Sequence, residues 1–121
     1  MINYLIIILF QVLTFNQKQY CVKTNSGFKC DFVQKQKTEF FVSENLLEEH
    51  IDSKYNEKLY LKDMTETVWE GDSVYSFTAT SQPLGNSDQE YFIINISKSK
   101  QKLQIFRYYF NIEERWTFTN K

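Results

Sequence analysis

The sequence predicts an all-β fold, a mainly antiparallel meander of about eight short strands that forms a small barrel or a sandwich, with one short helix. Three observations predict this fold class. Short apolar runs of strand length recur along the chain, turn-forming residues separate them, and aromatic residues, which favour strands, make up 17% of the sequence. Residues 20–121 contain no linker and no repeat, so we predict a single domain there.

The predicted strands follow one another closely. The first two form a hairpin that contains both cysteines, and the later runs read, in order, KTEFFVS, KLYLKDM, SVYSFTAT, EYFIINISK, KLQIFRYYF and RWTFT. The run SVYSFTAT alternates, which places Tyr75, Phe77 and Ala79 on one side of a strand. Pro83 and Gly85 mark the loop that follows it.

One segment between these strands has helical spacing. Ser43 is a favoured N-terminal cap, and in ENLLEEHID the side chains of Leu47 and Ile51 are four residues apart and share one helical face. The predicted helix has only about two turns, so it is marginally stable by itself.

The two cysteines are predicted to form a disulfide inside the first hairpin. A two-residue turn within NSG pairs Thr24 with Gly27 and places Cys21 opposite Cys30. This is a non-hydrogen-bonded position, where Cα atoms are ~4.5 Å apart and a disulfide can close. A three-residue loop would shift the register by one, and the alternative is then a pair of unlinked thiols in the core.

The N-terminal residues contain an apolar run from Tyr4 to Phe15. A membrane-spanning helix needs about 20 apolar residues, whereas the apolar part of a signal peptide needs about 7 to 15. We therefore predict that residues 1–19 are a secretory signal peptide and that the protein is secreted or periplasmic, although no Lys or Arg precedes the run and no Ala-x-Ala pattern follows it. The alternatives are a buried strand and a membrane anchor formed by residues 4–15.

Charge and composition narrow the range of partners. The formal net charge of −1 gives no field that would attract nucleic acid, so no nucleic-acid partner is expected. Contact with a membrane is expected only if the N-terminal segment is retained. No metal site or cofactor is predicted, because the two cysteines lie far in sequence from the single histidine, His50, and glycine-rich phosphate loops are absent.

Turn positions predict the register of the last three strands. A two-residue turn at Ser99 and Lys100 pairs Phe92 with Arg107, and a four-residue loop at NIEE pairs Arg107 with Phe118. One face is then a core face. Its members are Phe92, Ile94, Ile96, Leu103, Ile105, Tyr109, Trp116 and Phe118. Arg107 lies among these apolar neighbours, either as an anchor for an anion or paired with an acid such as Glu113.

The opposite face of these strands is too aromatic for plain exposure to solvent. Its residues are Tyr91, Ile93, Asn95, Gln104, Phe106, Tyr108 and Phe110, with Thr117 and Thr119. Either the short helix or the N-terminal segment covers it, or it binds a partner in a barrel lumen or on a contact surface. In the second case the candidate binding residues are Tyr91, Gln104, Phe106 and Tyr108, and the partner is a protein or an apolar small molecule.

Catalysis has a weaker basis in the sequence. Glu48, Glu49, His50 and Asp52 within EEHID could form an acid and base set or a weak cation site, and an exported hydrolase using Glu48, His50 and Asp52 is the alternative function. A solvated helix face explains the same residues, so we favour a small exported, non-enzymatic binding or interaction domain. Asn95-Ile96-Ser97 fits the acceptor pattern for N-glycosylation but lies in a predicted strand.

No family is assigned from the residues. Lipocalins are similar in strand count, but their Gly-x-Trp pattern is absent, since Trp69 precedes Gly71 here. The cysteine-bearing hairpin is similar to that of small periplasmic lysozyme inhibitors, but the C-terminal RWTFTNK lacks the cysteine that usually closes their fold.

Overall fold

The structure is a computed structural model that describes residues 11–43, 45–82 and 90–120. These residues form one antiparallel sheet of nine strands, which confirms the all-β prediction. The strands are β1 (Gln11–Thr24), β2 (Gly27–Cys30), β3 (Gln34–Val42), β4 (Leu46–Ile51), β5 (Lys54–Trp69), β6 (Asp72–Thr80), β7 (Glu90–Ser97), β8 (Lys102–Tyr109) and β9 (Ile112–Thr119). Within the described ranges, no helix is long and apolar enough to cross a membrane.

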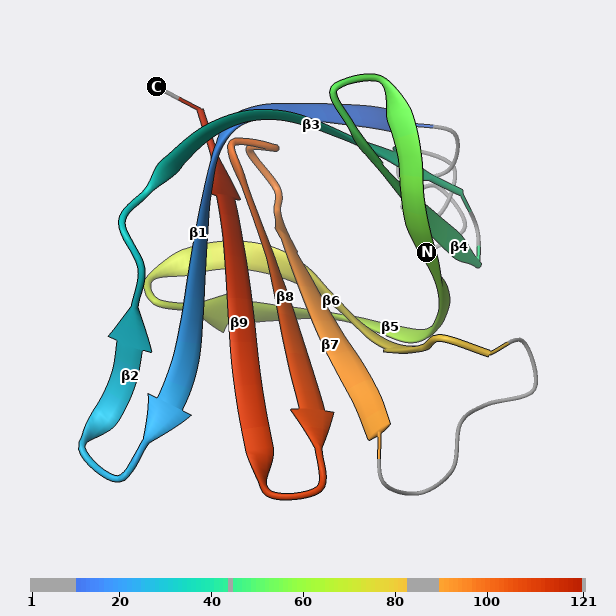
Figure 1. The fold of residues 1–121 in the computed structure, drawn as a ribbon. Helices are drawn as coiled ribbons and strands as arrows, with labels where there is room; N and C mark the ends of the chain where they lie inside the picture. The colour runs from blue at the N-terminus through green and yellow to red at the C-terminus, as the bar shows by residue number, and fades with distance from the viewer. Residues whose placement is uncertain (1–10, 44, 83–89, 121) are drawn as a thin grey trace.

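The sheet closes into a barrel. From β3 to β9 each strand pairs with the next one in the chain, and β9 pairs with β1, which in turn pairs with β3 (Figure 1). β2 stays outside this ring, because it pairs only with the C-terminal part of β1. Closure of the other eight strands leaves them without a free edge.

The barrel interior is filled by every second residue of each strand. Three phenylalanines from β1, β3 and β9 meet there: the ring centroids of Phe40 and Phe118 are 4.8 Å apart, and those of Phe15 and Phe40 are 6.1 Å apart. The buried apolar cluster comprises Leu13, Phe15, Phe40, Val42, Leu47, Leu59, Leu61, Phe77, Ala79, Phe92, Ile94, Ile96, Leu103, Ile105 and Phe118. We call the part around Phe15, Phe40, Val42, Ile96 and Leu103 the packed half.

The pairing of β1 with β3 is irregular next to Phe15, and the residues of β1 that face inward change there. Between Phe15 and Gln17 β1 advances by two residues while β3 advances by three, from Thr38 to Lys35, so the extra residue of this β-bulge lies on β3. Before the bulge the buried Leu13 and Phe15 point into the barrel, and after it Lys18 lies against the Phe118 ring. The bulge therefore brings polar side chains into the lower part of the barrel.

The helix predicted around ENLLEEHID is wrong, because residues 46–51 form strand β4. β4 pairs with β3 on one side and with β5 on the other, as in Glu39 with His50 and Leu47 with Leu59. A helix of two turns would satisfy few backbone groups, whereas a strand between two neighbours satisfies most of them. Tertiary pairing outweighs the local helical pattern.

The predicted hairpin registers are confirmed in two cases and wrong in one. Cys21 lies opposite Cys30, and Phe92 lies opposite Arg107. At the last hairpin the turn is Phe110 and Asn111, so Arg107 pairs with Glu114 and not with Phe118. The turn requires Phe110 at a φ of 54°, which is rare for a bulky residue and which the sequence pattern could not indicate. The shift is even, so each residue keeps its predicted face.

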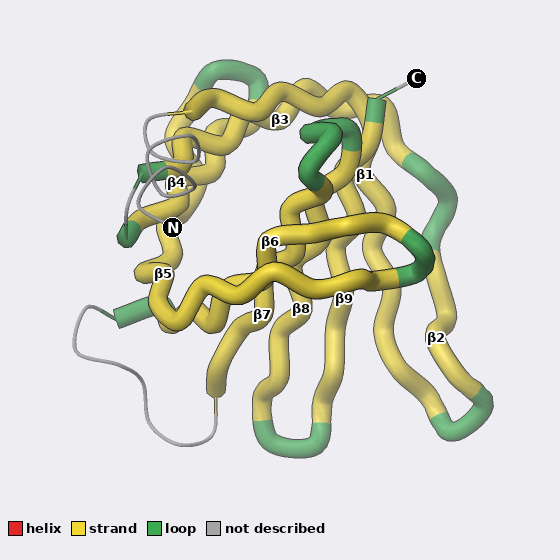
Figure 2. The backbone as a smooth tube through the Cα atoms, turned by 180° about the vertical axis from the view of Figure 1, so that it is seen from behind, coloured by secondary structure: helices red, strands yellow, loops and turns green. Residues whose placement is uncertain are grey.

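The end of the β5–β6 hairpin folds over the outer surface of β7 and β8 (Figure 2). A bulge between Lys62 and Thr65 lets β5 bend there. Trp69 near the tip contacts Phe106, with ring centroids 5.5 Å apart. The ion pairs Glu66–Lys98 and Glu70–Lys102 hold the same hairpin against the β7–β8 turn. The segment predicted to cover this face was the short helix or the N-terminus, and the covering element among the described residues is this hairpin.

Candidate functional site: a cavity in the barrel

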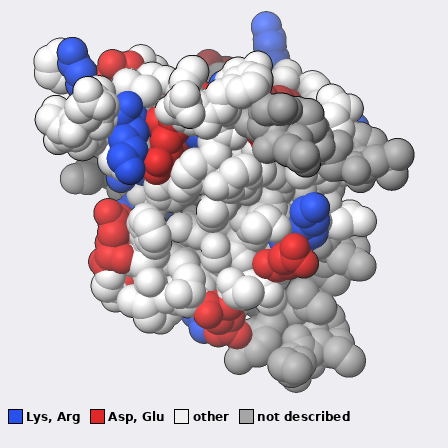
Figure 3. All heavy atoms as spheres, turned by 90° about the horizontal axis from the view of Figure 1, so that it is seen from below, with Lys and Arg blue, Asp and Glu red and all other residues white. Residues whose placement is uncertain are grey.

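The end of the barrel where β7 begins and β8 ends contains a cavity of about 400 Å³. Seen from below, the molecule shows separate charged side chains around the margin of its surface and uncharged atoms at the centre (Figure 3). The cavity is lined by Lys18, Glu49, Asn56, Glu57, Leu59, Ser81, Glu90, Phe92, Ile105, Arg107, Trp116 and Phe118. We call this part of the barrel the hollow half.

The floor of the cavity is apolar. Leu59, Phe92, Ile105 and Phe118 are all buried core residues, and Trp116 packs against the same cluster. The Trp116 ring also lies 5.3 Å from the ring of Tyr20, centroid to centroid. A molecule that entered the cavity would therefore contact hydrocarbon and aromatic surface at its deep end.

One wall of the cavity is a chain of hydrogen bonds centred on Arg107. Its Nε and Nη2 each lie 2.7 Å from Oε2 of Glu90, and its Nη1 donates to Oε1 of Glu114 at 2.9 Å. The Tyr20 hydroxyl donates to the other oxygen of Glu114, and the Ser81 hydroxyl lies 3.4 Å from Glu90 Oε1. We call these five residues the Arg107 belt. The acid predicted to pair with Arg107 was Glu113, and the register of β9 replaces it with Glu114.

The belt shifts the pKa values of its members. Its hydrogen bond to Glu114, followed by burial, raises the pKa of Tyr20 to about 12, so the hydroxyl keeps its proton at neutral pH. Desolvation lowers the pKa of Arg107, but the hydrogen bonds to Glu90 and Glu114 outweigh it and raise the pKa overall. The guanidinium therefore stays charged and hydrogen-bonded to two carboxylates.

The wall across the cavity carries two carboxylates. Glu49 on β4 and Glu57 on β5 are direct cross-strand partners, and β4 and β5 lie four places from β8 and β9 around the ring. Glu49 is only 5% exposed and accepts a hydrogen bond of 2.8 Å from Asn56. The Glu57 side chain is exposed to the cavity, and partial desolvation, followed by the charge of Glu49, raises its pKa. We call Glu49 and Glu57 the acidic pair.

The four predicted binding residues lie on the outer surface of β7 and β8, and the structure divides them into two groups. Gln104 and Phe106 are buried, with exposed fractions of 4% and 3%, beneath the β5–β6 hairpin. Tyr91 and Tyr108 lie beyond that hairpin and stack on each other, with centroids 4.8 Å apart; Tyr91 is 46% exposed. Burial and the nearby Glu113 raise the pKa of Tyr108.

The alternative catalytic residues lie outside the cavity. The Nε2 atom of His50 is 3.4 Å from Oε1 of Glu48, since residues two apart on a strand share a face. The imidazole also packs against Phe41, with ring centroids 4.5 Å apart, and Asp52 lies in the β4–β5 turn at a φ of 51°. Their catalytic role stays a prediction.

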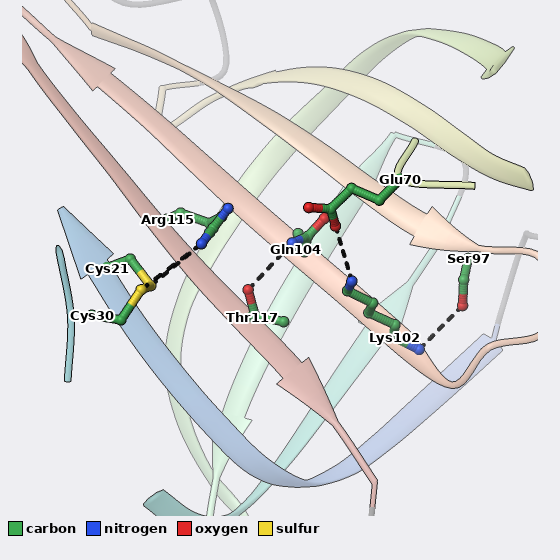
Figure 4. Close-up of polar contacts among 8 residues, drawn as sticks. All are labelled: Cys21, Cys30, Glu70, Ser97, Lys102, Gln104, Arg115 and Thr117. Atoms are coloured by element: carbon green, nitrogen blue, oxygen red, sulfur yellow. Dashed lines mark hydrogen bonds and ion pairs between the residues drawn. A yellow bond between two sulfur atoms is a disulfide. The ribbon is translucent and has the colours of Figure 1, made fainter. Parts of the chain in front are cut away.

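The predicted disulfide joins Cys21 and Cys30, whose Cα atoms are 4.0 Å apart. Arg115 on β9 points toward it, with Nη2 3.5 Å from Cys21 Sγ (Figure 4), and its guanidinium lies over the Phe28 ring. On the same outer surface Gln104 donates to the Thr117 hydroxyl, and Lys102 pairs with Glu70. The disulfide hairpin is thereby attached to the open end of the barrel.

Asn95, the glycosylation acceptor of the sequence pattern, is 4% exposed on this covered surface. Its Oδ1 accepts no hydrogen bond from the described part of the chain. The folded hairpin therefore blocks access to this side chain.

Sequence reasoning found part of the cavity and missed its acidic wall. Alternation in β8 and β9 already placed Arg107 with the core residues. The sequence pattern grouped Glu49 with the EEHID cluster of a predicted helix and not with a cavity, and Glu57 was missed because it precedes the apolar run of β5. Among the described residues, no three His, Cys, Asp or Glu side chains are grouped so that they could hold a metal ion.

Comparison of the chain with protein-family models, with curated proteins and with solved structures finds no match.

Proposed function

We propose that this protein is a non-enzymatic binding protein that holds one small, largely apolar molecule in the hollow half of its barrel. The observation that carries the proposal is the cavity of about 400 Å³ with an apolar floor and polar walls. Small-molecule sites commonly have volumes of about 300 to 1,000 Å³. Here five of the twelve lining residues are apolar and form the floor, and the other seven are polar or charged. Barrels of eight strands are wide enough for one small ligand.

The Arg107 belt supports binding over catalysis. Arg107, Glu90 and Glu114 bond to one another, so these groups form a fixed wall. A general base needs an accessible lone pair near the reacting atom, and the histidine of the chain packs outside the barrel. Among the lining groups, Glu57 is the carboxyl that stays open to the cavity, and no histidine lies beside it, so the cavity offers shape and contact area more than a paired acid and base.

Titration with a neutral apolar probe tests this proposal. The variant Trp69→Phe retains Trp116, which lines the cavity, as the single tryptophan of the chain. We expect 1-adamantanemethanol, which does not absorb near 280 nm, to change the Trp116 emission and to saturate at one molecule per chain. Amide chemical shifts of the unmodified protein should move around Phe92, Ile105 and Trp116.

Two matched variants serve as controls. Ile105→Phe adds atoms to the cavity floor, whereas Ile93→Phe adds the same atoms to the outer surface of the neighbouring strand. Ile105→Phe should weaken binding and Ile93→Phe should not. Absence of saturable binding, or shifts spread over the outer surface, would refute the proposal even if Ile105→Phe fails to fold.

The proposal includes an exported, oxidising compartment, which the disulfide supports. The first ten residues lie outside the described residues, and the predicted signal segment 1–19 overlaps β1 from Gln11 onward. A mature chain starting at Tyr20 would lose Leu13 and Phe15 from the core. N-terminal sequencing of protein made in a secreting host distinguishes the possibilities: loss of residues before Gln11 supports export, whereas an intact Met1 supports an uncleaved segment, either a membrane anchor or a strand of the fold.

A second candidate function is contact with a protein partner through the exposed Tyr91–Tyr108 stack. Phe110 and Ile112, at the adjoining hairpin, are 65% and 49% exposed. Aromatic residues of this kind are enriched in protein interfaces. Replacing Tyr91 and Tyr108 with Ser should abolish capture of such a partner while the thermal unfolding midpoint stays nearly unchanged.

A further inference from the structure

The acidic pair has a chemical consequence for the cavity. Like charges placed directly opposite each other on neighbouring strands repel, and Glu49 and Glu57 occupy such positions. The Asn56 amide offsets part of the repulsion by donating to Glu49. The pKa of Glu57 is also raised, first by partial desolvation of its side chain, which is exposed to the cavity, and then by the charge of Glu49.

The cations around the cavity leave this negative charge in excess. Lys18 and Arg107 are the two lining cations, against the three lining carboxylates Glu49, Glu57 and Glu90. Glu114 adds a fourth carboxylate by bonding to Arg107, so the formal sum is two minus four, or −2, with all groups ionised. Arg107 is already held by two carboxylates, which prevents it from turning to the acidic pair.

The remaining lining suits a ligand that is apolar at one end. The floor offers Phe92, Ile105 and the Trp116 ring. A cation near the acidic pair would gain charge-assisted hydrogen bonds, and an aromatic ring in the same cavity adds a cation–π attraction. An anionic ligand would be repelled, because the net charge of the cavity lining is negative.

We propose that the cavity selects a primary ammonium compound, whose charged group binds between Glu49 and Glu57 and whose compact hydrocarbon body lies on the apolar floor. This inference rests on the proposed function and names the class of ligand for the same site. The preference for a positive charge distinguishes this inference from a general apolar binding site, which would bind a neutral ligand of the same shape equally well.

Three ligands with one hydrocarbon body test the inference: 1-adamantanemethylamine, 1-adamantanemethanol and 1-adamantanecarboxylate. We expect the amine to bind about tenfold more tightly than the alcohol, the magnitude of one charge-assisted hydrogen bond, and the carboxylate to bind more weakly than both. The measurement is the Trp116 emission of the Trp69→Phe protein at neutral pH, with calorimetry as a second readout.

Variants of the acidic pair locate the effect. Glu57→Gln and Glu49→Gln keep the size of each side chain and remove its charge, so each should reduce the ratio of amine to alcohol affinity several-fold. Glu39→Gln, on the outer side of β3, is the matched control and should leave that ratio unchanged.

The outcomes separate the two proposals. Equal affinity for amine and alcohol, or a ratio that survives in both glutamine variants, would overturn the ammonium inference and leave the binding function intact. Failure of all three ligands to bind would overturn the binding function itself.

Discussion

The packed half and the hollow half of the barrel interior belong to the same eight strands, yet they are filled in different ways. Phe15 and Phe40 meet ring against ring in the packed half and both lie against Phe118, which forms the boundary with the cavity; all three are essentially inaccessible to solvent. In the hollow half the inward positions of β8 and β9 hold Arg107 and Glu114, which bond to each other and leave a cavity.

This difference shows how one alternating pattern can serve two purposes. Apolar side chains interdigitate to crystal-like density, so they stabilise the fold by excluding water. Charged side chains must keep hydrogen-bond partners and some solvent, so they cannot fill a barrel completely. We therefore expect the packed half to carry most of the stability and the hollow half to carry the function.

The largest effect is expected from emptying the packed half. Phe40→Ala removes a fully buried ring and leaves a void between Phe15 and Phe118, so it should lower the free energy of unfolding by about 3 to 5 kcal/mol. Urea denaturation followed by circular dichroism measures the change. Phe32→Ala, at a side chain that is 94% exposed, is the control and should cost less than about 0.5 kcal/mol. A similar loss of unfolding free energy in both variants would contradict the division into a packed half and a hollow half.

Loss of the disulfide should act on the hollow half. Replacing Cys21 and Cys30 with Ser removes a short closed loop and should lower the free energy of unfolding by about 2 to 3 kcal/mol. β1 and β2 extend from the open end of the barrel, so hydrogen exchange should accelerate there first and remain slow around Phe40. Uniform acceleration over both halves would show that the two are one cooperative unit.

Breaking the Arg107 belt should have a smaller effect on stability. Arg107→Leu leaves Glu90 and Glu114 without their common cation, and the expected loss is about 1 to 3 kcal/mol because these groups are only partly buried. Arg107→Lys keeps the charge but not the fork of donors, so it should recover part of the loss. If the leucine variant is as stable as the unmodified protein, the belt is not a structural wall.

The smallest effect, and the one of opposite sign, is expected from Glu57→Gln. The pKa of Glu57 is higher in the folded protein than in the unfolded chain. The free energy of unfolding therefore decreases as the pH rises from the ordinary carboxyl pKa to the raised one, because Glu57 ionises less readily in the folded state. The facing groups are Glu49 and Glu90, which add to this decrease, and Lys18 and Arg107, which reduce it.

We therefore expect the variant and the unmodified protein to unfold at the same temperature at acid pH, and the variant to unfold slightly higher at neutral pH. Calorimetry at several pH values measures the difference, with Glu39→Gln as the control. A variant that is less stable at neutral pH would mean that the ionised Glu57 is favourably paired.

Local pattern by itself determined the strand class, two hairpin registers and the face of each residue in the last three strands. Cys21 opposite Cys30 and Phe92 opposite Arg107 follow from two-residue turns, because a hairpin register depends only on the turn between its strands. Alternation predicted the core face of β7 to β9. The predicted turn between β8 and β9 was wrong, but it shifted the register by an even number of residues, so each residue kept its face.

Tertiary structure alone decided the features that depend on neighbours distant in the sequence. Strand β4 formed because β3 and β5 supply partners on both sides, and the β5–β6 hairpin covered Phe106 because β5 bends at its bulge. The acidic pair faces the Arg107 belt only because the sheet closes between β1 and β9. The residue pattern within one segment shows which side of a strand is apolar. Which strand lies across the barrel from it depends on how the whole sheet closes.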